Sequence, residues 1–348
     1  MRREPPEVAE LGGKRLLAPM IPPRYGGLGW THAQLGDLCC DLGSVDSALR
    51  AAVTVQSMTA AAVVRWGSAG LRDRVLPGLS DGSLLAGFCL TEPEAGSDAA
   101  SVRSQATART GSWLLDGAKV WVTGGRWADV LLVIAATAEG PLALLVEAGG
   151  DGVRREPVED SLAMPGAGLA DIAFDRVEVP ADAVVGRPGM GLSHVAGVAL
   201  ANGRLTVAAG CAGLARTCRD HAVAHARSRR QDSRPIGDHQ LVRRLLARAG
   251  VASNSADLVY RWAAAGLDER ADDAGHRAIL AKYTAARAAD EAADCATQVL
   301  GSAAFRAGHP VTALVADARV MRIIEGTDEI CESVIGETLL RSRGDSGR

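Results

Sequence analysis

The sequence pattern of this 348-residue chain changes twice, and the order of the patterns constrains the fold more than any other feature. Apolar residues recur at helical spacing in residues 1–86, short runs of β-forming residues fill 87–188, and helical spacing returns in 189–348. We therefore predict an α+β chain with an N-terminal helical domain, a central antiparallel β-barrel-like or sandwich domain and a C-terminal four-helix bundle.

Individual helices are predicted in the first and last of these domains. Asp46 or Ser47 is placed to cap a helix that runs through Arg65. In the last domain the spacing predicts helices at 204–228, 239–267, 277–300 and 311–324. The first of these four is built from Ala, Gly, Val and Cys, a composition that permits close helix approach.

The central domain carries strand patterns. Trp113–Gly117 and Lys119–Val122 are predicted to form two strands around an Asp-Gly turn. Val130–Ala135 is a continuous apolar run, and apolar residues alternate with polar ones in Ile172–Val179.

Composition and charge exclude several classes of protein. The chain is 47% hydrophobic and 23% charged, which is typical of a soluble globular protein. Its net charge of −3 gives no general attraction to nucleic acid or to an anionic membrane. Because the chain has neither an 18-residue apolar run nor a signal-peptide core, we predict a cytoplasmic protein that binds neither membrane nor nucleic acid.

The cysteines and histidines show no metal-binding spacing. Seven cysteines without a C-x-x-C pair, in a chain that is not exported, predict reduced and mostly buried thiols. His221 and His225 lie four residues apart on a predicted helix, but no third ligand is near them in the sequence. We therefore predict no metal site.

Two short segments favour a cradle for a polar aromatic cofactor. Leu90–Asp98 reads LTEPEAGSD, and Trp121–Gly124 reads WVTG. In the first segment Thr91 and Ser97 supply hydroxyls, while Gly96 lets the backbone approach a ligand closely. Taken alone, these residues also fit a solvated loop, and the indole also fits a place in the core.

A third segment adds one carboxylate at the end of an apolar helix. Glu325 follows Ile323 and Ile324 and precedes Gly326, so its side chain is expected to leave the helix against apolar neighbours. Burial raises the pKa of a carboxylate and makes it a usable base near neutral pH. The alternative is a solvated helix-terminal glutamate, as expected for Glu329 and Glu332.

In their order and spacing, these motifs resemble those of the acyl-CoA dehydrogenases, and the resemblance covers nearly the whole chain. It implies that family's fold, with a helical N-terminal domain, a β-domain and a C-terminal four-helix bundle. The motifs are LTEPEAGSD at 90–98, GAKVWVTGG at 117–125, RPIGDHQ at 234–240, QVLGS at 298–302 and RIIEGTDEI at 322–330.

The resemblance implies FAD as the cofactor and assigns residues to it. The flavin ring would lie against Phe88, Leu90, Thr91, Gly96, Ser97, Trp121, Val122 and Thr123. In the family a neighbouring subunit holds the dinucleotide end, and the matching residues are Arg229, Gln240, Gln298, Val299, Gly301 and Ser302, with Thr327 and Glu329 on the bundle side.

The resemblance also implies a reaction. Glu325 matches the catalytic base, and Ser97, Arg204 and Gly326 match substrate contacts. In the family the base removes the α-proton of an acyl thioester while the β-hydrogen leaves as hydride to flavin N5. The backbone N–H of the base polarises the thioester oxygen. This chemistry requires Glu325 to face the flavin across a gap that fits one thioester.

The chain departs from the family pattern in three places. Asp232-Ser233 replaces the Phe-Gly of the loop that holds FAD across the dimer contact, and an Asp there would repel a pyrophosphate. Met164–Gly168 replaces an Arg-x-Ser loop that touches phosphopantetheine in relatives, which bears on recognition of ordinary CoA. The N-terminal domain is short and is expected to lack a first helix.

One subgroup is more similar to this chain than the rest. Segments 210–219, 222–227 and 237–242 resemble dehydrogenases of polyketide gene clusters that make hydroxymalonyl- and methoxymalonyl-type extender units on an acyl carrier protein. In that setting Glu325 would deprotonate an alcohol or an aldehyde hydrate rather than a carbon acid.

Two other functions remain open from the sequence. One is the same chemistry on a free, short-chain acyl-CoA. The other is a non-catalytic acyl-binding scaffold, which the altered 232–233 loop favours and the joint presence of Thr91, Trp121 and Glu325 opposes. For an enzyme, the resemblance implies a homo-oligomer, either a homodimer or a tetramer, and a separate electron-transfer acceptor that reoxidises the flavin.

Overall fold

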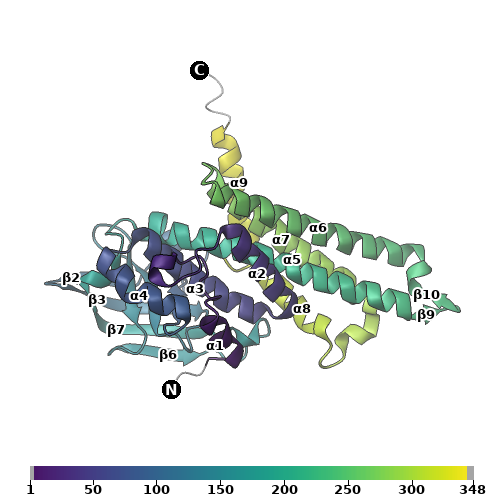
Figure 1. Cartoon of the computed structure of the whole chain (residues 1–348), viewed down its shortest axis with the longest axis horizontal. Helices are drawn as coiled ribbons and strands as arrows, with labels where there is room; N and C mark the ends of the chain where they lie inside the picture. The colour runs from purple at the N-terminus through teal and green to yellow at the C-terminus, as the bar shows by residue number, and fades with distance from the viewer. Residues whose placement is uncertain (1–3, 343–348) are drawn as a thin grey trace. The chain divides into compact units, whose positions relative to one another are not determined.

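The computed structural model describes residues 4–342 (Figure 1). The outermost ends of the first and last predicted domains, 1–3 and 343–348, lie outside the described residues. Clustering of contacts divides the chain into two compact units. The strand unit comprises the described residues up to Thr31 together with 51–161 and 165–203, and the helix unit comprises 32–50, 162–164 and the described residues from Arg204 on. The three-domain boundaries given by the sequence stay a prediction.

Four α-helices lie between Pro6 and Asp81. They are α1 (Pro6–Gly13), α2 (His32–Val45), α3 (Ser47–Trp66) and α4 (Ala69–Asp81). The predicted start of α3 is confirmed, because Asp46 Oδ1 accepts hydrogen bonds from the backbone N–H groups of Ala48 and Leu49 at 2.6 and 3.3 Å. The described chain begins with the short helix α1, and the predicted loss of the family's first helix stays a prediction.

The strand unit contains two four-stranded sheets. One sheet has the order β1-β4-β5-β8. The other has the order β2-β3-β7-β6, and its strands are labelled in Figure 1. The neighbouring strands pair antiparallel, apart from the parallel pair β1 and β4. The strands are β1 (Ala86–Cys89), β2 (Gln105–Arg109), β3 (Ser112–Val122), β4 (Val130–Ala135), β5 (Leu142–Glu147), β6 (Val153–Pro157), β7 (Ala170–Pro180) and β8 (Val184–Val185).

The predicted turn at Asp116-Gly117 is wrong, because β3 continues through it. Asp116 Oδ1 accepts a hydrogen bond from the backbone N–H of Arg176 on the neighbouring strand at 2.9 Å, and the pairing register shifts beside it. Gly117 has φ +143°, and a Cβ there would lie 2.4 Å from Ser104 Oγ. The Asp-Gly pair therefore forms a bulge with a close approach, and the sequence signal for a bulge resembles that for a turn.

The predicted strands at 130–135 and 172–179 are confirmed as β4 and as part of β7. All six residues of β4 are buried, which explains why its sequence is uniformly apolar. The inward residues of β3 and β7 alternate with outward ones and pack with β4 and β5 in one hydrophobic cluster. This packing gives the loops at the ends of β1 and β3 a rigid base.

The helix unit contains most of α5 (Gly197–Ser228) with α6 (Gln240–Asp268), α7 (Ala274–Leu300), α8 (Pro310–Met321) and α9 (Asp328–Ser342). Helices α6 and α7 lie side by side along most of their length (Figure 1). The expected close approach at α5 is confirmed, because a Cβ at Gly213 would lie 1.9 Å from the carbonyl oxygen of Cys40 on α2. The predicted fourth helix ends at Met321 rather than Ile324, and α9 was not predicted.

Two helices, Ser47–Trp66 and the continuous stretch Gly191–Ser228, are long and apolar enough to cross a membrane by length and composition alone. Most of each is buried inside the protein, as in the core helices of globular proteins. All seven cysteines are free and buried, which confirms the prediction of reduced, buried thiols.

Candidate active site

A buried ion pair holds the T-E-P segment (Thr91-Glu92-Pro93) of the strand unit in place. Glu92 Oε1 lies 2.7 Å from Lys119 Nζ, and the two side chains are 4% and 0% exposed. The Glu92 carboxylate also accepts hydrogen bonds from the backbone N–H groups of Arg103 and Ser104 and from the Ser104 hydroxyl. Lys119 Nζ donates to the carbonyl of Leu90 at 3.1 Å. Glu92, the second residue of the T-E-P segment, therefore has a structural role.

Electrostatics strengthen this anchor. Burial on its own would raise the pKa of Glu92, but the hydrogen bonds from Lys119, Ser104 and Arg103 outweigh it and lower the pKa of Glu92 to about 2. The carboxylate is thus ionised at neutral pH, and each of its charged hydrogen bonds is stronger than a neutral one.

The anchor leaves the rest of the segment at the surface beside β3. The carbonyl of Thr91 accepts a hydrogen bond from the backbone N–H of Val120 at 2.9 Å, so the two predicted flavin segments lie next to each other. Gly96 and Ser97 are exposed, and Thr91 is partly buried. Phe88 and Leu90 pack partly buried against the core.

Trp121 lies on the surface of the strand unit, so its alternative place in the core is wrong. Its side chain is 59% exposed, and its backbone is left-handed with φ +58°. The backbone N–H donates to Asp171 Oδ1 at 3.0 Å, within the register shift between Lys119 and Val122. The shift buries Val122 and turns the indole outward.

This surface fits a planar aromatic ligand with a polar edge. A left-handed backbone at a non-glycine residue is a strain that clusters at ligand-binding sites, so we interpret the indole of Trp121 as a candidate ligand contact. Hydroxyls of Thr91 and Ser97 and the partly buried Thr123 lie on the same two segments. The strand unit therefore holds residues suited to a flavin ring, and the assignment of each one to FAD stays a prediction.

The predicted base lies in the helix unit, in the turn between α8 and α9. Glu325 is partly buried as a residue, but its Oε2 atom is sealed from solvent and has no hydrogen-bond partner among residues 4–342. Burial raises the pKa of Glu325, while the charges of Arg204, Arg50 and Lys282 lower it. The carboxylate is buried, as expected from the apolar residues before it, and its role as base stays a prediction.

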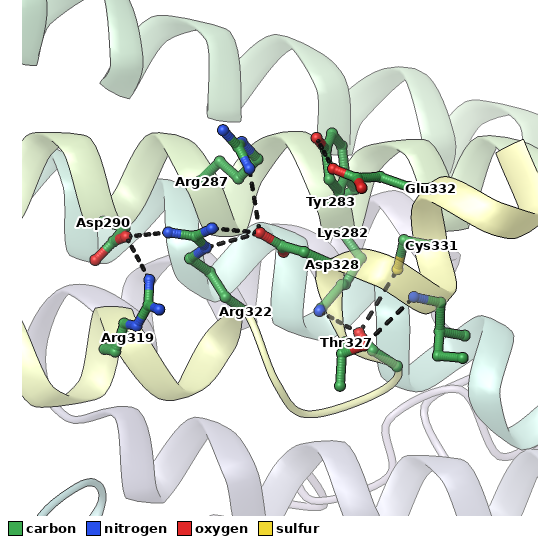
Figure 2. A network of polar contacts seen from close by, with 12 residues as sticks. Lys282, Tyr283, Arg287, Asp290, Arg319, Arg322, Thr327, Asp328, Cys331 and Glu332 are labelled. Atoms are coloured by element: carbon green, nitrogen blue, oxygen red, sulfur yellow. Dashed lines mark hydrogen bonds and ion pairs between the residues drawn. The ribbon is translucent and has the colours of Figure 1, made fainter. Parts of the chain in front are cut away.

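A network of ion pairs fixes both ends of this turn (Figure 2). Asp328, the first residue of α9, accepts hydrogen bonds from Arg322 at 2.8 Å and from Arg287 at 3.3 Å. Arg322 also bonds to Asp290 of α7 at 2.6 Å. The backbone N–H of Asp328 donates to the carbonyl of Arg322 at 3.1 Å, which closes the turn around Glu325.

The predicted dinucleotide residues lie at the surface of the helix unit. Arg229, Gln240, Gln298, Gly301 and Ser302 are exposed, and Val299 is buried. They lie at the ends of helices α5, α6 and α7, with Gln298 and Val299 in the last turn of α7, and helix ends offer backbone donors and acceptors. Thr327 is partly buried and bonds through its hydroxyl to the N–H of Ile330, while Glu329 is exposed.

The substituted residues Asp232 and Ser233 form the tip of a two-residue hairpin between β9 (Arg230–Gln231) and β10 (Arg234–Pro235). Their φ angles are +49° and +64°, the left-handed pair of a type I′ turn. Both side chains are exposed. The turn favours Asp at the first position and Gly at the second, so Ser233 carries the strain.

Sequence reasoning missed the buried cations. Arg50 and Lys282 are 1% and 0% exposed and lie close enough to Glu325 to change its pKa. One signal was available: the chain has only three lysines among 38 basic residues, and two of them, Lys119 and Lys282, stand in predicted strand and helix cores.

Comparisons with known proteins identify the family and the fold. Three family models match the chain: the acyl-CoA dehydrogenase N-terminal domain over residues 2–83, the middle domain over 87–177 and the C-terminal domain over 189–340. These matches confirm the predicted fold class.

Similar proteins include a glutaryl-CoA dehydrogenase from Desulfococcus multivorans, 32% identical over 94% of this chain and 86% of that protein. An acyl-CoA dehydrogenase from Bacillus subtilis is 33% identical over 96% and 89%. Among solved structures, FkbI for biosynthesis of the methoxymalonyl extender unit of the Fk520 polyketide is 38% identical, with a TM-score of 0.90 and coverage of 97% and 94%. A glutaryl-coenzyme A dehydrogenase in complex with glutaryl-CoA is 30% identical, with a TM-score of 0.91 and coverage of 96% and 86%.

The buried pair under the T-E-P segment generates a stability prediction. Lys119→Met leaves the Glu92 carboxylate buried without its cation and is expected to destabilise the protein by about 3–5 kcal/mol. The double variant Glu92→Gln/Lys119→Met removes the uncompensated charge and should recover part of the loss. Denaturant midpoints compare the variants, and equal midpoints for the single and double variants would contradict this assignment.

The same pair predicts a pH dependence. The pKa of Glu92 falls from its ordinary 4.5 to about 2 on folding, so its contribution to stability is complete above about pH 4.5 and is lost as pH falls toward 2. This acid loss should be smaller in the double variant, because glutamine does not titrate. Unfolding midpoints measured across that range check the sign.

Proposed function

The chain belongs to the acyl-CoA dehydrogenase family of FAD-dependent oxidoreductases, and we propose that it oxidises a short acyl group carried as a thioester on an acyl carrier protein. The proposed product is a hydroxymalonyl-type extender unit. The observation that carries the proposal is a sealed carboxylate, Glu325, among three cationic side chains. A cytoplasmic homo-oligomer with a separate electron acceptor is part of the same proposal.

Glu325 is suited to accept a proton. Its Oε2 makes no hydrogen bond within the described chain, so a lone pair is available to the substrate. Burial raises its pKa, which makes it a stronger base than an exposed glutamate. We assign polarisation of the thioester oxygen to the backbone N–H of Glu325, as in the family. FAD, when bound against Thr91, Ser97 and Trp121, supplies the hydride acceptor.

The buried side chain of Arg50 favours a substrate whose acyl group carries a carboxylate or acquires one during the reaction. Its guanidinium is buried on α3, donates from Nη2 to Met164 Sδ and Met321 Sδ at 3.3 Å each, and interacts electrostatically with Glu325. Arginine binds carboxylates through two parallel hydrogen bonds, and exclusion of water strengthens such a pair. Two similar structures are named for acyl groups with a second carboxylate, methoxymalonyl and glutaryl.

A carrier-protein substrate is supported by the altered loop at Met164. Met164 has a left-handed backbone with φ +47°, and its N–H donates to Asp317 Oδ1 at 2.7 Å while its sulfur contacts Arg50. Buried contacts thus fix this loop at the position of the family's Arg-x-Ser loop. The similarity to FkbI, which covers almost the whole of both chains, favours the same carrier.

The second candidate is the same oxidation on a free acyl-CoA, which the glutaryl-CoA dehydrogenases among the relatives favour. The two candidates differ in the carrier. Purified enzyme is assayed with butyryl-CoA, butyryl-carrier protein and glyceryl-carrier protein, and flavin reduction is followed by absorbance. We expect the glyceryl-carrier protein to reduce the flavin fastest. Preference for butyryl-CoA would overturn the carrier-protein proposal and leave the second candidate.

Replacement of the proposed base gives the most direct prediction. Glu325→Gln preserves the shape of the side chain and should keep the fold and the yellow colour, while turnover falls by about 10²–10⁴-fold. Glu332→Gln is the matched control, since Glu332 is an exposed glutamate of α9 whose contact is the Tyr283 hydroxyl. Full activity of Glu325→Gln would remove this residue from its role.

The role of Arg50 is tested by binding. Malonyl-carrier protein is offered as a competitive inhibitor to the unaltered enzyme and to Arg50→Lys, which keeps the charge but loses the planar donor pair. Inhibition should weaken by about 10-fold or more, consistent with about 2 kcal/mol for a disrupted buried charge pair. Inhibition by butyryl-carrier protein serves as the control. Equal weakening for both inhibitors would indicate a change of shape and not of carboxylate recognition.

A further inference from the structure

The turn that presents Glu325 has a backbone that its own sequence does not favour. Glu325 has φ +56°, and Gly326 has φ +104°. A glutamate in the left-handed region costs about 1–2 kcal/mol, so neighbouring groups must hold it there. Side chains outside the turn must therefore supply this constraint.

Two cationic side chains bind the two carbonyl groups of this strained pair. Arg204 Nε donates to the Glu325 carbonyl at 3.1 Å, and Lys282 Nζ donates to the Gly326 carbonyl at 2.6 Å. Figure 2 shows the Lys282 ammonium directed at the turn from α7, with Cys331 Sγ at 3.6 Å from the same oxygen. Consecutive carbonyls are therefore held from two different helices.

Lys282 is the less expected of the two cations. It is fully buried, and a buried ammonium loses hydration that a single carbonyl only partly replaces. The chain uses arginine at 35 of its 38 basic positions, yet a lysine stands here. An ammonium is a compact point charge, whereas a guanidinium needs space for a planar fork. A requirement for a small positive charge at the Gly326 carbonyl explains why Lys282 is buried here.

We propose that Lys282 is a positioning residue that, together with Arg204, fixes the left-handed Glu325–Gly326 backbone and so directs the Glu325 carboxylate. This inference rests on the proposed role of Glu325 as base. Neither Lys282 nor its contact was identified from the sequence. The ion-pair network of Arg322 and Asp328 holds the ends of the turn, while Lys282 acts on its centre.

The charge of Lys282 has a second effect on the base. The ionisable groups that act on Glu325 come from three helices: Arg50 of α3, Arg204 of α5 and Lys282 of α7, all of which favour the ionised carboxylate against burial. Burial lowers the pKa of Lys282 itself, and Cys331, Cys211, Asp328 and Glu325 oppose that change. Removing this ammonium therefore raises the pKa of Glu325 further, and the ionised base is reached only at higher pH.

The test compares Lys282→Met with Lys282→Arg and with the control Lys14→Met, which alters an exposed lysine bonded to Glu10 on α1. The first readout is hydrogen exchange by mass spectrometry in segment 322–331 of the flavin-loaded protein. We expect faster exchange in this segment for Lys282→Met, unchanged exchange for Lys14→Met and an intermediate rate for Lys282→Arg. Unaltered exchange in Lys282→Met would overturn the positioning role.

The second readout is the pH profile of kcat/KM on glyceryl-carrier protein or butyryl-CoA, whichever the unaltered enzyme oxidises. In Lys282→Met the acid limb should move to higher pH, with kcat reduced by about 10²-fold and KM changed little. Lys282→Arg should restore the acid limb. An unmoved acid limb in an otherwise folded, yellow Lys282→Met protein would overturn the inference, whereas an unaltered enzyme inactive on both thioesters would contradict the proposed function instead.

Discussion

A buried ammonium group donates to a backbone carbonyl in each of the two loops that form the candidate active site. Lys119 donates to the Leu90 carbonyl under the T-E-P segment, and Lys282 donates to the Gly326 carbonyl beside the base. Both lysines are fully buried in a chain whose other basic residues, apart from one exposed lysine, are arginines. The two contacts differ in charge balance. Lys119 has Glu92 as a partner, whereas Lys282 has a carbonyl and the nearby Glu325.

Two of the residues with a left-handed backbone, Trp121 and Glu325, are the predicted flavin contact and the predicted base. Trp121 and Glu325 are both non-glycine residues with φ between +50° and +60°. Each is held by a side chain from another element: Asp171 binds the backbone N–H of Trp121, and Arg204 binds the carbonyl of Glu325. A left-handed residue interrupts the regular direction of a strand or helix, so its side chain leaves the packed face. The indole is thereby exposed, and the carboxylate is presented at a helix end.

The long periodic segments were predictable, because packing on one side imposes a period that the sequence shows directly. Helices α3, α5, α6 and α7 and strand β4 agree with their predictions to within a few residues, apart from the start of α5. The bulge at Gly117 was not predictable, since Asp-Gly is equally compatible with a turn or a bulge. The end of α8 was predicted three residues too late, at 324 instead of Met321, and α9 was not predicted. Arg50 was missed because a single arginine in a helical pattern carries no sign of whether it is buried.

The scarcity of lysine has a practical consequence. In the described chain the amines of Lys119 and Lys282 are sealed, and the Lys14 side chain is 61% exposed. Among the lysines of the described chain, an amine-directed reagent therefore labels the folded protein at Lys14. Since Lys119 belongs to the strand unit and Lys282 to the helix unit, their labelling rates report separately how often each unit opens.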